Sequence, residues 1–360
     1  MNSPITYRTV KDSGGSGALP RMSAALATAV TLAAVAAALL SSHPSIALRA
    51  FFIAPFLNAP SFLSMLELSA PLALCALGVI ITFRAGHYSL GGEGQAYAGS
   101  FAAAAVGYAG FLGVGPAATV AAIIAGALAG AAVAALPAAG KRYAGADVLL
   151  TSILISQGAI FVIDWAISGP LRDQTGNLIA MPALQRDILL PRLAPPSTLT
   201  LAPFAAVLLC LVAAFYFERT RSGAAHDLYG RNPRFAGLQG YNVQRLAWLP
   251  IIVTGMLHGL AGAFMVLGAK GTALRGMSGG IGWSAIGVAL VAGSRPAAVP
   301  VAALLFAWLD SGARQAAVLS DLPPDAGLAI KALVILVVSA RPSWSFIKVL
   351  KTRLTHGSRA

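Results

Sequence analysis

The stretch F-R-A-G-H-Y-S-L-G-G-E-G-Q, from Phe83 to Gln95, decides how the rest of this chain is understood. It carries Arg84, His87 and Glu93 among glycines, and uncharged segments rich in small residues flank it on both sides. A glycine-rich run with a carboxylate cannot face lipid, because its backbone groups would lack hydrogen-bond partners there. Such a run is tolerated only where it is buried in protein or lines a wet cavity. We therefore expect this stretch to line the path of a polar solute.

The composition is that of an integral membrane protein. The 360 residues are 57% hydrophobic and only 10% charged, with a mean hydropathy of +0.76, whereas soluble domains carry about 25% charged residues. The net charge is +13, but the basic residues lie in the gaps between apolar segments, not on one basic face with aromatic neighbours, which argues against nucleic-acid binding. Cys75 and Cys210 lie inside apolar segments and are predicted to be buried thiols, not a disulfide or a metal pair.

Ten apolar segments approach the length of about 20 residues that crosses a bilayer core. The predicted fold class is therefore an all-α integral membrane protein, a polytopic bundle of about ten transmembrane helices. The first segment is longer than the apolar region of a signal peptide and is predicted to be retained. A further segment, 43–62, is broken by prolines and is predicted to lie along the membrane interface. The ten segments are 22–40, 63–83, 96–112, 117–136, 148–167, 199–217, 246–267, 283–294, 297–313 and 322–340.

The distribution of lysine and arginine predicts that the N-terminus lies in the cytoplasm. With that orientation the inner segments hold 17 of the 25 basic residues, as the positive-inside rule requires. An even number of spans then places both tails, 1–21 and the basic 341–360, on the inner side. Two loops are long enough to carry function: the outer loop 168–198 and the inner loop 218–245.

Several carboxylates and glycines have structural explanations. Ser64 and Glu67 have the spacing of a capping box, and Asp147 and Asp325 stand where helix N-caps are expected. The G-x-x-x-G pairs at 126–130 and 255–259 are predicted to be helix-packing surfaces, and those two ranges need no solute to explain them.

The sequence G-G-x-G occurs twice, at 91–94 and at 279–282, each time after an apolar span and a basic residue. With the predicted orientation, the span before the first copy runs inward and the span before the second runs outward. Interrupted segments at corresponding places in two inverted halves are the best sequence pointer to a transporter's binding site. We therefore predict an inverted internal repeat, although two short glycine motifs can also coincide in a chain with 38 glycines.

The inner loop contains R-N-P-R-F-A-G-L-Q-G, which predicts a short helix of about two turns. Asn232 can cap it, Pro233 suits its first turn, and a glycine at 237 or 240 can end it. Phe235 and Leu238, three residues apart, point the same way. An ordinary surface loop would not need a capped helix with two apolar side chains, so an exposed apolar patch rimmed by arginines favours a protein contact.

Three motifs, taken together, resemble the permease subunits of bacterial ATP-binding-cassette (ABC) importers. They are F-R-A-G-H-Y-S-L-G-G-E-G-Q, then T-R-S-G with G-R-N-P-R-F-A-G-L-Q-G-Y-N-V, then S-G-G-I-G-W-S-A-I-G-V-A-L-V-A-G. The most similar branch serves nucleosides and simple sugars and is related to the branched-chain amino-acid permeases. The resemblance covers roughly 60–340 in the expected order, within a permease domain 22–340. Asp227 departs from it, because these permeases often have a basic residue there, and His87-Tyr88-Ser89 replaces the usual Leu-Phe-Asn.

The resemblance implies a set of partners. The inner loop would be the coupling helix that fits a groove on cytoplasmic ATP-binding subunits, so that this chain is no enzyme and binds neither ATP nor a cofactor itself. A second permease subunit, identical or different, would complete the path, and an extracytoplasmic solute-binding protein would dock on outer surfaces such as 168–198. The protein would lie in the bacterial cytoplasmic membrane. The residues assigned to the coupling element are Asn232, Pro233, Ala236, Gly237 and Gly240, together with the exposed Phe235 and Leu238.

Glu93 and Gln95 are the first candidates for solute contact, because an ionisable residue at membrane depth is a functional candidate by default. Glu93 could instead bind Arg84 or a helix terminus, and His258 could equally make an interhelical bond. Asp164 is predicted to be hydrated, and Asp310 to pair with Arg314 one turn later. The remaining candidates for the substrate path are Gly91, Gly92, His87, Tyr88 and Trp283, with Tyr97 as a further ring that could stack on a base.

The leading hypothesis is a permease subunit that moves a polar small solute by alternating access. A nucleoside is the first candidate solute and a simple sugar the second. The alternatives are a branched-chain amino-acid ABC permease, an ion-coupled secondary transporter with Glu93, Asp164 or Asp310 as its coupling carboxylate, and a channel or an intramembrane enzyme. The sequence has no phosphate-binding loop and no metal-ligand motif, so ATP would have to be bound by another chain.

Overall fold

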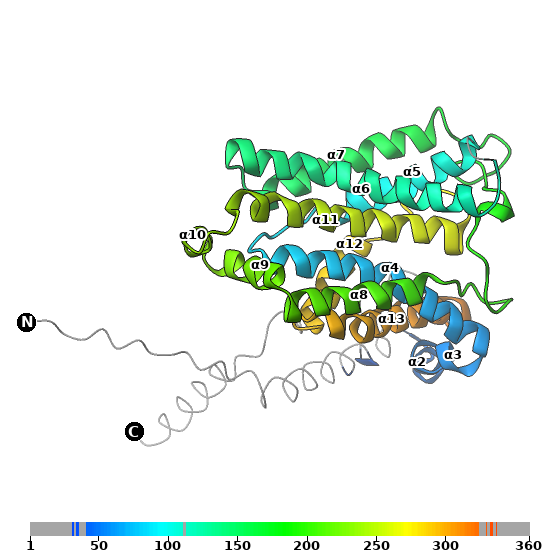
Figure 1. The fold of residues 1–360 in the computed structure, drawn as a ribbon. Helices are drawn as coiled ribbons and strands as arrows, with labels where there is room; N and C mark the ends of the chain where they lie inside the picture. Colours follow the sequence, from blue (N-terminus) through cyan, green and yellow to red (C-terminus); the bar gives the residue numbers. More distant parts are fainter. Residues whose placement is uncertain are drawn as a thin grey trace, which may run out of the picture.

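The computed structural model describes residues 41–110 and 113–323, together with positions 31, 34, 35, 329, 332, 333 and 336. The described residues form a bundle of helices (Figure 1), with one isolated bridge between Ala180 and Leu274 and no longer strand among them. In this part of the chain, six helical segments are long and apolar enough to cross a membrane. They are α4 (Ala59–Arg84), α6 (Pro116–Ala144), α7 (Val148–Ser168), α8 (Ala202–Arg219), α11 (Val243–Phe264) continued by the π-helix η2 (Met265–Lys270), and α13 (Val299–Leu319) preceded by the 3-10 turn η3 (Pro296–Ala298).

Two further helices are shorter or more polar than a typical span. α5 (Gly92–Ala109) begins inside the first glycine motif, and α12 (Ile281–Val291) begins inside the second. The 11 residues of α12 rise about 16 Å, roughly half of a bilayer core. The described residues therefore confirm an all-helical membrane fold but not ten full-length spans. The predicted segments 22–40 and 322–340, both tails and the Asp325 cap lie largely or wholly outside the described residues.

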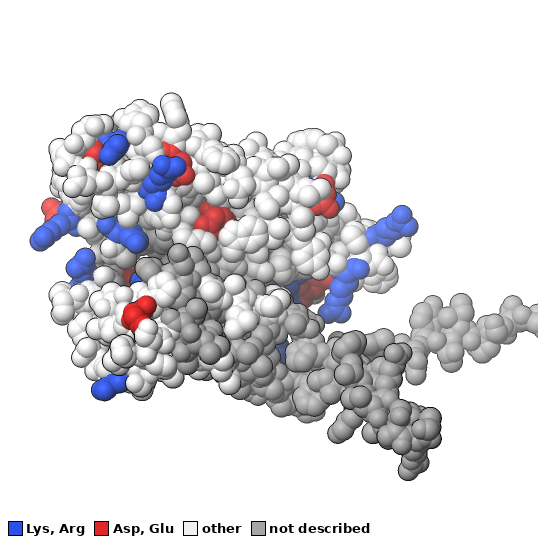
Figure 2. Space-filling model, turned by 180° about the vertical axis from the view of Figure 1, so that it is seen from behind, with Lys and Arg blue, Asp and Glu red and all other residues white. Residues whose placement is uncertain are grey.

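Charge is distributed as expected for a protein that spans a membrane. On the face drawn in Figure 2, lysines and arginines gather toward the two ends of the molecule, with a largely uncharged band between them. One end carries the short helix α10 (Pro233–Leu238), and we call it the α10 end. The other end carries the loop 168–198, with the 3-10 turn η1 (Arg186–Ile188), and we call it the loop end.

The proline-rich segment 43–62 forms helices. Pro44 is the first residue of α2 (Pro44–Phe52), and the later prolines lie in the first turns of α3 (Ala54–Leu57) and α4, where their missing N–H groups cost nothing. α2 packs on α13: the Trp308 indole donates to the carbonyl of Phe52 at 3.2 Å. Gly312 lies so close to α2 that an added Cβ would be 2.1 Å from the Phe51 carbonyl oxygen. This segment is thus part of the packed bundle at its edge.

The two predicted G-x-x-x-G surfaces pack against each other, which confirms that prediction. A Cβ added to Gly130 on α6 would lie 2.2 Å from the carbonyl oxygen of Gly255 on α11, and one added to Gly259 would lie 2.2 Å from that of Gly126. α5 joins the same contact, because a Cβ on Gly99 would lie 2.2 Å from the Gly259 carbonyl oxygen. Backbones this close gain packing contacts that lipid cannot replace.

The capping-box prediction at Ser64 and Glu67 is wrong. α4 begins at Ala59, after Asn58, so both residues lie inside the helix. Glu67 is 4% exposed and accepts hydrogen bonds from the backbone N–H of Thr200 at 2.8 Å and from its hydroxyl at 2.8 and 3.0 Å. It anchors the segment before α8. The spacing S-x-x-E was therefore coincidental, and the carboxylate satisfies a partner more than a hundred residues away.

Other local predictions are confirmed. Asp147 caps α7 by accepting from the backbone N–H groups of Leu149 at 2.8 Å and Leu150 at 3.2 Å. Cys75 and Cys210 are free and buried. Cys75 belongs to the apolar core that α4 forms with α12 and α13.

Candidate functional site

The chain between α4 and α5 returns into the bundle without forming a helix. Residues 85–91 alternate in exposure: Ala85, His87, Ser89 and Gly91 are buried, whereas Gly86 and Tyr88 between them are exposed. Two serines of α7 satisfy backbone groups at its far end: Ser152 Oγ accepts from the N–H of residue 90 at 2.9 Å, and Ser156 Oγ accepts from that of residue 94 at 2.8 Å. The later part of the irregular backbone is thus packed against protein that satisfies its polar groups, as its composition requires. We call residues 85–91 the re-entrant strip.

The two glycine motifs meet at the end of this strip. Glu93, on the first turn of α5, accepts hydrogen bonds from the backbone N–H of Gly280 at 2.9 Å and from that of Gly282 at 2.7 Å. The carboxylate is only 8% exposed and lies at the N-terminus of α12, where a negative charge is stabilised. The helix-terminus alternative for Glu93 is therefore the observed one, and Arg84 binds elsewhere. Direct contact of Glu93 with solute stays a prediction. We call the contact between residues 91–94 and 279–282 the junction.

Gln95 and His258 connect three helices beside the junction. His258 Nδ1 lies 2.7 Å from Gln95 Oε1, and its Nε2 lies 3.0 Å from the carbonyl oxygen of Cys75. Both side chains are 1% exposed, so α4, α5 and α11 are joined by a buried polar chain. If the His258 ring donates from Nε2 to the Cys75 carbonyl, its Nδ1 is an acceptor. The amide nitrogen of Gln95 can then donate to Nδ1, because the amide oxygen and nitrogen can exchange places to suit the hydrogen-bond network. His258 is thus an interhelical connector.

The glycines of the first motif are required by close packing. A Cβ on Gly92 would lie 3.1 Å from His258 Nε2, and one on Gly91 would lie 3.3 Å from the backbone of Ser152. On Gly94 it would lie 2.5 Å from the carbonyl oxygen of Ser156. The motif therefore lets α5 begin against α7 and α11 without displacing either.

The predicted rings are distributed around the strip and do not gather at Glu93. His87 is 7% exposed and packs on Tyr229, with ring centroids 5.8 Å apart, and its Nε2 has no hydrogen-bond partner among the described residues. Tyr88 is 60% exposed and packs on Phe83. Trp283 is 43% exposed on α12. Of these three rings, Tyr88 and Trp283 are therefore the two with exposed surface.

Asp164 is partnered, contrary to the prediction that it is simply hydrated. Tyr97 donates its hydroxyl to Asp164 Oδ1 at 2.6 Å, and Arg275 Nε lies 3.6 Å from Oδ2. The Tyr97 oxygen in turn accepts from the backbone N–H of Gly276 at 3.0 Å. This network fixes α5 and α7 to the loop that leads into α12. The sequence carried no local signal for it, because its members lie on separate segments.

The inner loop forms two helices, α9 (Arg221–Arg231) and α10 (Pro233–Leu238). Asn232 caps α10 by accepting from the Phe235 N–H at 3.0 Å, and Pro233 is its first residue. The helix ends at Leu238, and Gly240 has φ +82°, a conformation that favours glycine. These observations confirm the predicted short helix. Ala236, on the inner face of α10, is fully buried. Gly237, which also belongs to the predicted coupling element, lies in the same helix.

The outer face of α10 is apolar. Phe235 is 44% exposed and Leu238 is 84% exposed. The helix lies at the extreme of the bundle, clear of the spanning helices (Figure 1). Large apolar side chains exposed together on a capped helix are typical of a surface that contacts another molecule.

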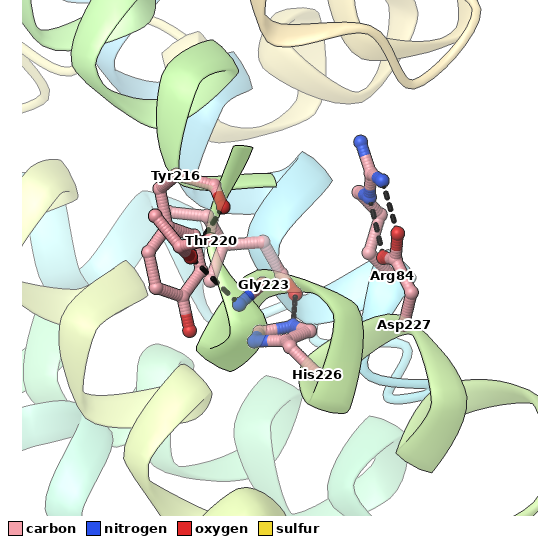
Figure 3. Close-up of polar contacts among 7 residues, drawn as sticks. Arg84, Tyr216, Thr220, Gly223, His226 and Asp227 are labelled. Atoms are coloured by element: carbon pink, nitrogen blue, oxygen red, sulfur yellow. Dashed lines mark hydrogen bonds and ion pairs between the residues drawn. The ribbon is translucent and has the colours of Figure 1, made fainter. Parts of the chain in front are cut away.

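An ion pair ties α9 to the end of α4 (Figure 3). Arg84 donates from Nε to Asp227 Oδ1 at 2.7 Å, and its second nitrogen pairs with Oδ2. The guanidinium also lies 4.0 Å from the ring centroid of Phe217 on α8. A two-pronged arginine–carboxylate contact of this kind has defined geometry. Asp227 therefore pairs with the end of α4 and is not part of the exposed face of α10.

Further contacts hold α9 against the same point. His226 Nε2 lies 2.9 Å from the carbonyl oxygen of Ile81, and Thr220 caps α9 by accepting from Gly223 N–H at 3.0 Å. Gly230 is so close that an added Cβ would lie 1.9 Å from the Arg84 carbonyl oxygen. Burial lowers the pKa of His226 below its ordinary value, and the Ile81 carbonyl opposes that shift. α9 thus contacts the beginning of the re-entrant strip directly.

The fold and this geometry are those of a multi-pass membrane protein with an irregular re-entrant segment and a projecting helix. Residues 61–339 match the family described as "Branched-chain amino acid transport system / permease component", and the chain belongs to that family. It is 30% identical over 313 residues to a probable riboflavin import permease protein of Treponema pallidum, covering 85% of this chain and 81% of the relative. It is 29% identical over 285 residues to a guanosine ABC transporter permease protein of Bacillus subtilis, covering 77% and 80%.

A nucleoside ABC transporter permease protein of Lactococcus lactis is 26% identical over 302 residues, covering 81% of this chain and 82% of the relative. No solved structure matches. The chain is therefore the permease subunit of an ABC importer for a small polar solute and is not an enzyme. The family works with separate ATP-binding subunits and a solute-binding protein.

Proposed function

We propose that this permease imports a solute made of a flat nitrogen heterocycle joined to a five-carbon sugar or sugar alcohol, as in nucleosides and riboflavin. The relatives named for riboflavin, guanosine and nucleosides share that chemistry. A nucleoside is the first candidate, and a simple sugar, which shares only the hydroxyl-bearing part, is the second.

The observation that carries an ATP-driven mechanism is the exposed apolar face of α10, which is held rigidly to the bundle through α9. We assign this face to contact with the cytoplasmic ATP-binding subunits, so that the α10 end lies in the cytoplasm; with the predicted first and last spans, both chain termini would lie there too. Movement of α10 would pass through the Arg84–Asp227 pair to the re-entrant strip and from there to the junction. The side on which the path is open would change with that movement, which is alternating access.

The junction also supports an inverted internal repeat within a ten-span permease. α5 and α12 both begin there, at the two copies of G-G-x-G. α5 leads to the loop end, where Gly107 packs on Leu184, whereas α12 leads the chain back to the start of α13. Interrupted helices that meet in this way are typical of transporter binding regions.

Co-purification with the ATP-binding subunits tests the proposed docking. Phe235→Asp and Leu238→Asp place a charge on the apolar face and should abolish recovery of the ATPase with the permease. Leu178→Asp is the matched control, because Leu178 is 69% exposed but lies on the loop 168–198, and it should leave recovery unchanged. Undiminished ATPase recovery with both α10 variants would disprove the assignment.

An ion-coupled secondary transporter is the competing mechanism. It would take up solute without ATP-binding subunits and would stop when an ionophore dissipates the proton and sodium gradients. The proposed importer requires the ATPase and continues in the presence of the ionophore.

A further inference from the structure

A cavity of about 170 Å³ lies beside the junction, between α4, η2, α12 and α13. One water molecule needs about 10–15 Å³ on the same measure, so the cavity has room for a small ring system. It is lined by residues of the second glycine motif, including Gly279 and Ile281. None of the side chains that the sequence singles out as the first candidates for solute contact lines it.

The cavity has one apolar and one polar side. Leu72 of α4, Phe264 and Met265 supply apolar surface. Ser278 and Ser284 supply hydroxyl groups, and neither hydroxyl makes a hydrogen bond within the described residues. Ser284 is buried at 6% exposure, so its hydroxyl is available to a molecule inside the cavity.

The mouth of the cavity is charged. Lys270 and Arg314 are exposed, and Asp310 is half-buried beside them. Lys270 ends η2 immediately before Gly271, whose carbonyl oxygen accepts from the N–H of Leu184 in the loop 168–198. The mouth therefore lies toward the loop end, on the side from which an imported solute arrives.

The polar groups first expected to bind solute are engaged within the protein. Both carboxylate oxygens of Glu93 accept backbone N–H groups of the second motif, and Gln95 is bound to His258. The other face of that same motif borders the cavity. Residues of the π-helix η2 line another part of the cavity, and π-helical turns are frequent at functional sites.

We propose that this cavity is the solute-binding site of the permease and that it takes a flat heterocycle bearing a ribose-type polyol. The ring lies on Phe264 and the methionines, whose polarisable side chains suit aromatic surfaces. The polyol hydroxyls bond to Ser278, Ser284 and Asp310, and Lys270 and Arg314 meet ring carbonyl oxygens at the mouth. Glu93 is a positioning residue, because it holds the start of α12 and hence Ser284. This inference rests on the proposed function.

Site-directed thiol labelling tests the inference in the full assembly in membranes. Ser284→Cys and, independently, Ser278→Cys introduce thiols into the cavity, while the native Cys75 and Cys210 are buried and give the background. A membrane-impermeant charged maleimide is added from the outer side, with guanosine, riboflavin or glucose as the competing probe. Thr175→Cys, on the exposed part of the loop 168–198, is the control, and no probe should change its labelling rate.

The expected result is that both cavity thiols are labelled and that guanosine or riboflavin slows the reaction. When the solute concentration is ten times its Kd, the fraction of unoccupied sites falls about tenfold. The labelling rate should fall by the same factor. Which of the two protects identifies the ring system. Absence of labelling at both positions, protection by glucose alone, or no protection by any probe would overturn the inference.

The inference and the proposed function fail in different ways. Uptake that depends on ATP and on α10, with cavity thiols that no solute protects, would refute the cavity while leaving the importer intact. A permease that neither recovers the ATPase nor takes up solute with ATP would refute the importer itself.

Discussion

The two sides of this bundle are held together differently. On one side α5, α6 and α11 meet through glycine backbones, with an added Cβ on Gly130, Gly259 or Gly99 only 2.2 Å from a facing carbonyl oxygen. On the other side α4, α12 and α13 meet through larger side chains, α12 spans only 11 residues, and a cavity of about 170 Å³ remains between them. The first side is a wall of closely packed backbones, and the second is where we propose that a solute binds. The junction, held by Glu93, joins the two.

The largest expected effect comes from breaking the glycine wall. Gly130→Leu would place side-chain atoms against the backbones of Gly255 and Gly259, neither of which can yield cheaply, at a cost of at least about 1–3 kcal/mol. We expect loss of the monodisperse peak in detergent size-exclusion chromatography. Gly158→Leu on α7 is the control, because a Cβ there meets nothing within 4 Å. A well-folded Gly130→Leu variant would contradict the account of the wall.

Removing the carboxylate of the junction is expected to have the next largest effect. Glu93→Ala leaves the buried N–H groups of Gly280 and Gly282 without their acceptor, and each unsatisfied group costs about 1–3 kcal/mol. Glu93→Gln keeps one acceptor oxygen and should be intermediate in thermal stability and in uptake. Glu218→Gln, at an exposed position, should match the unmodified protein. Equal stability of the alanine variant and the unmodified protein would show that the junction is not held by Glu93.

The contacts behind these two predictions differ in how well the local sequence predicts them. The glycine spacing at 126–130 and 255–259 is enough to predict a packing face. The local positions of Asn232 and Asp147 are likewise enough to predict helix starts. The partners of Glu93 stand 187 and 189 residues away, and Thr200, the partner of Glu67, stands 133 residues away. Only the fold brings them together, so the spacing at Ser64 and Glu67 was misleading. The two G-G-x-G copies were the one signal that could have paired Glu93 with α12.

The cavity could not be foreseen because its walls come from four separate segments and its polar groups are ordinary serines. Sequence reasoning placed function on the residues that are unusual at membrane depth, namely Glu93, Gln95 and His258. In the structure, these residues hold irregular backbone and helix ends together.

Reversing the Arg84–Asp227 pair gives a smaller and more specific effect. Arg84→Asp or Asp227→Arg places like charges together at the end of α4 and should reduce uptake while leaving ATPase recovery intact. The double variant restores an opposite-charge pair and should recover part of the uptake, because residues in contact are energetically coupled. The readout is solute uptake per ATP hydrolysed. A double variant no better than the worse single variant would argue that the pair does not link α9 to the strip.

The smallest expected effect is a pH dependence from His226. Burial lowers the pKa of His226 in the folded protein relative to about 6.5 in an unfolded chain. Its contribution to stability is therefore present above about 6.5 and is lost as the pH falls through the folded value. His226→Gln keeps a donor for the Ile81 carbonyl but cannot titrate. The difference in melting temperature between the two proteins should shrink or reverse as the pH falls from 7 to 5, and a constant difference would contradict the prediction.

The most direct test of the account is solute uptake by the purified permease reconstituted into proteoliposomes, with and without its ATP-binding subunits. We predict ATP-dependent accumulation of guanosine or riboflavin that persists when ionophores dissipate ion gradients and that Leu238→Asp abolishes. Accumulation by the permease alone, driven by an ion gradient and unaffected by Leu238→Asp, would contradict the central claim that an external motor acting at α10 opens this sheltered path.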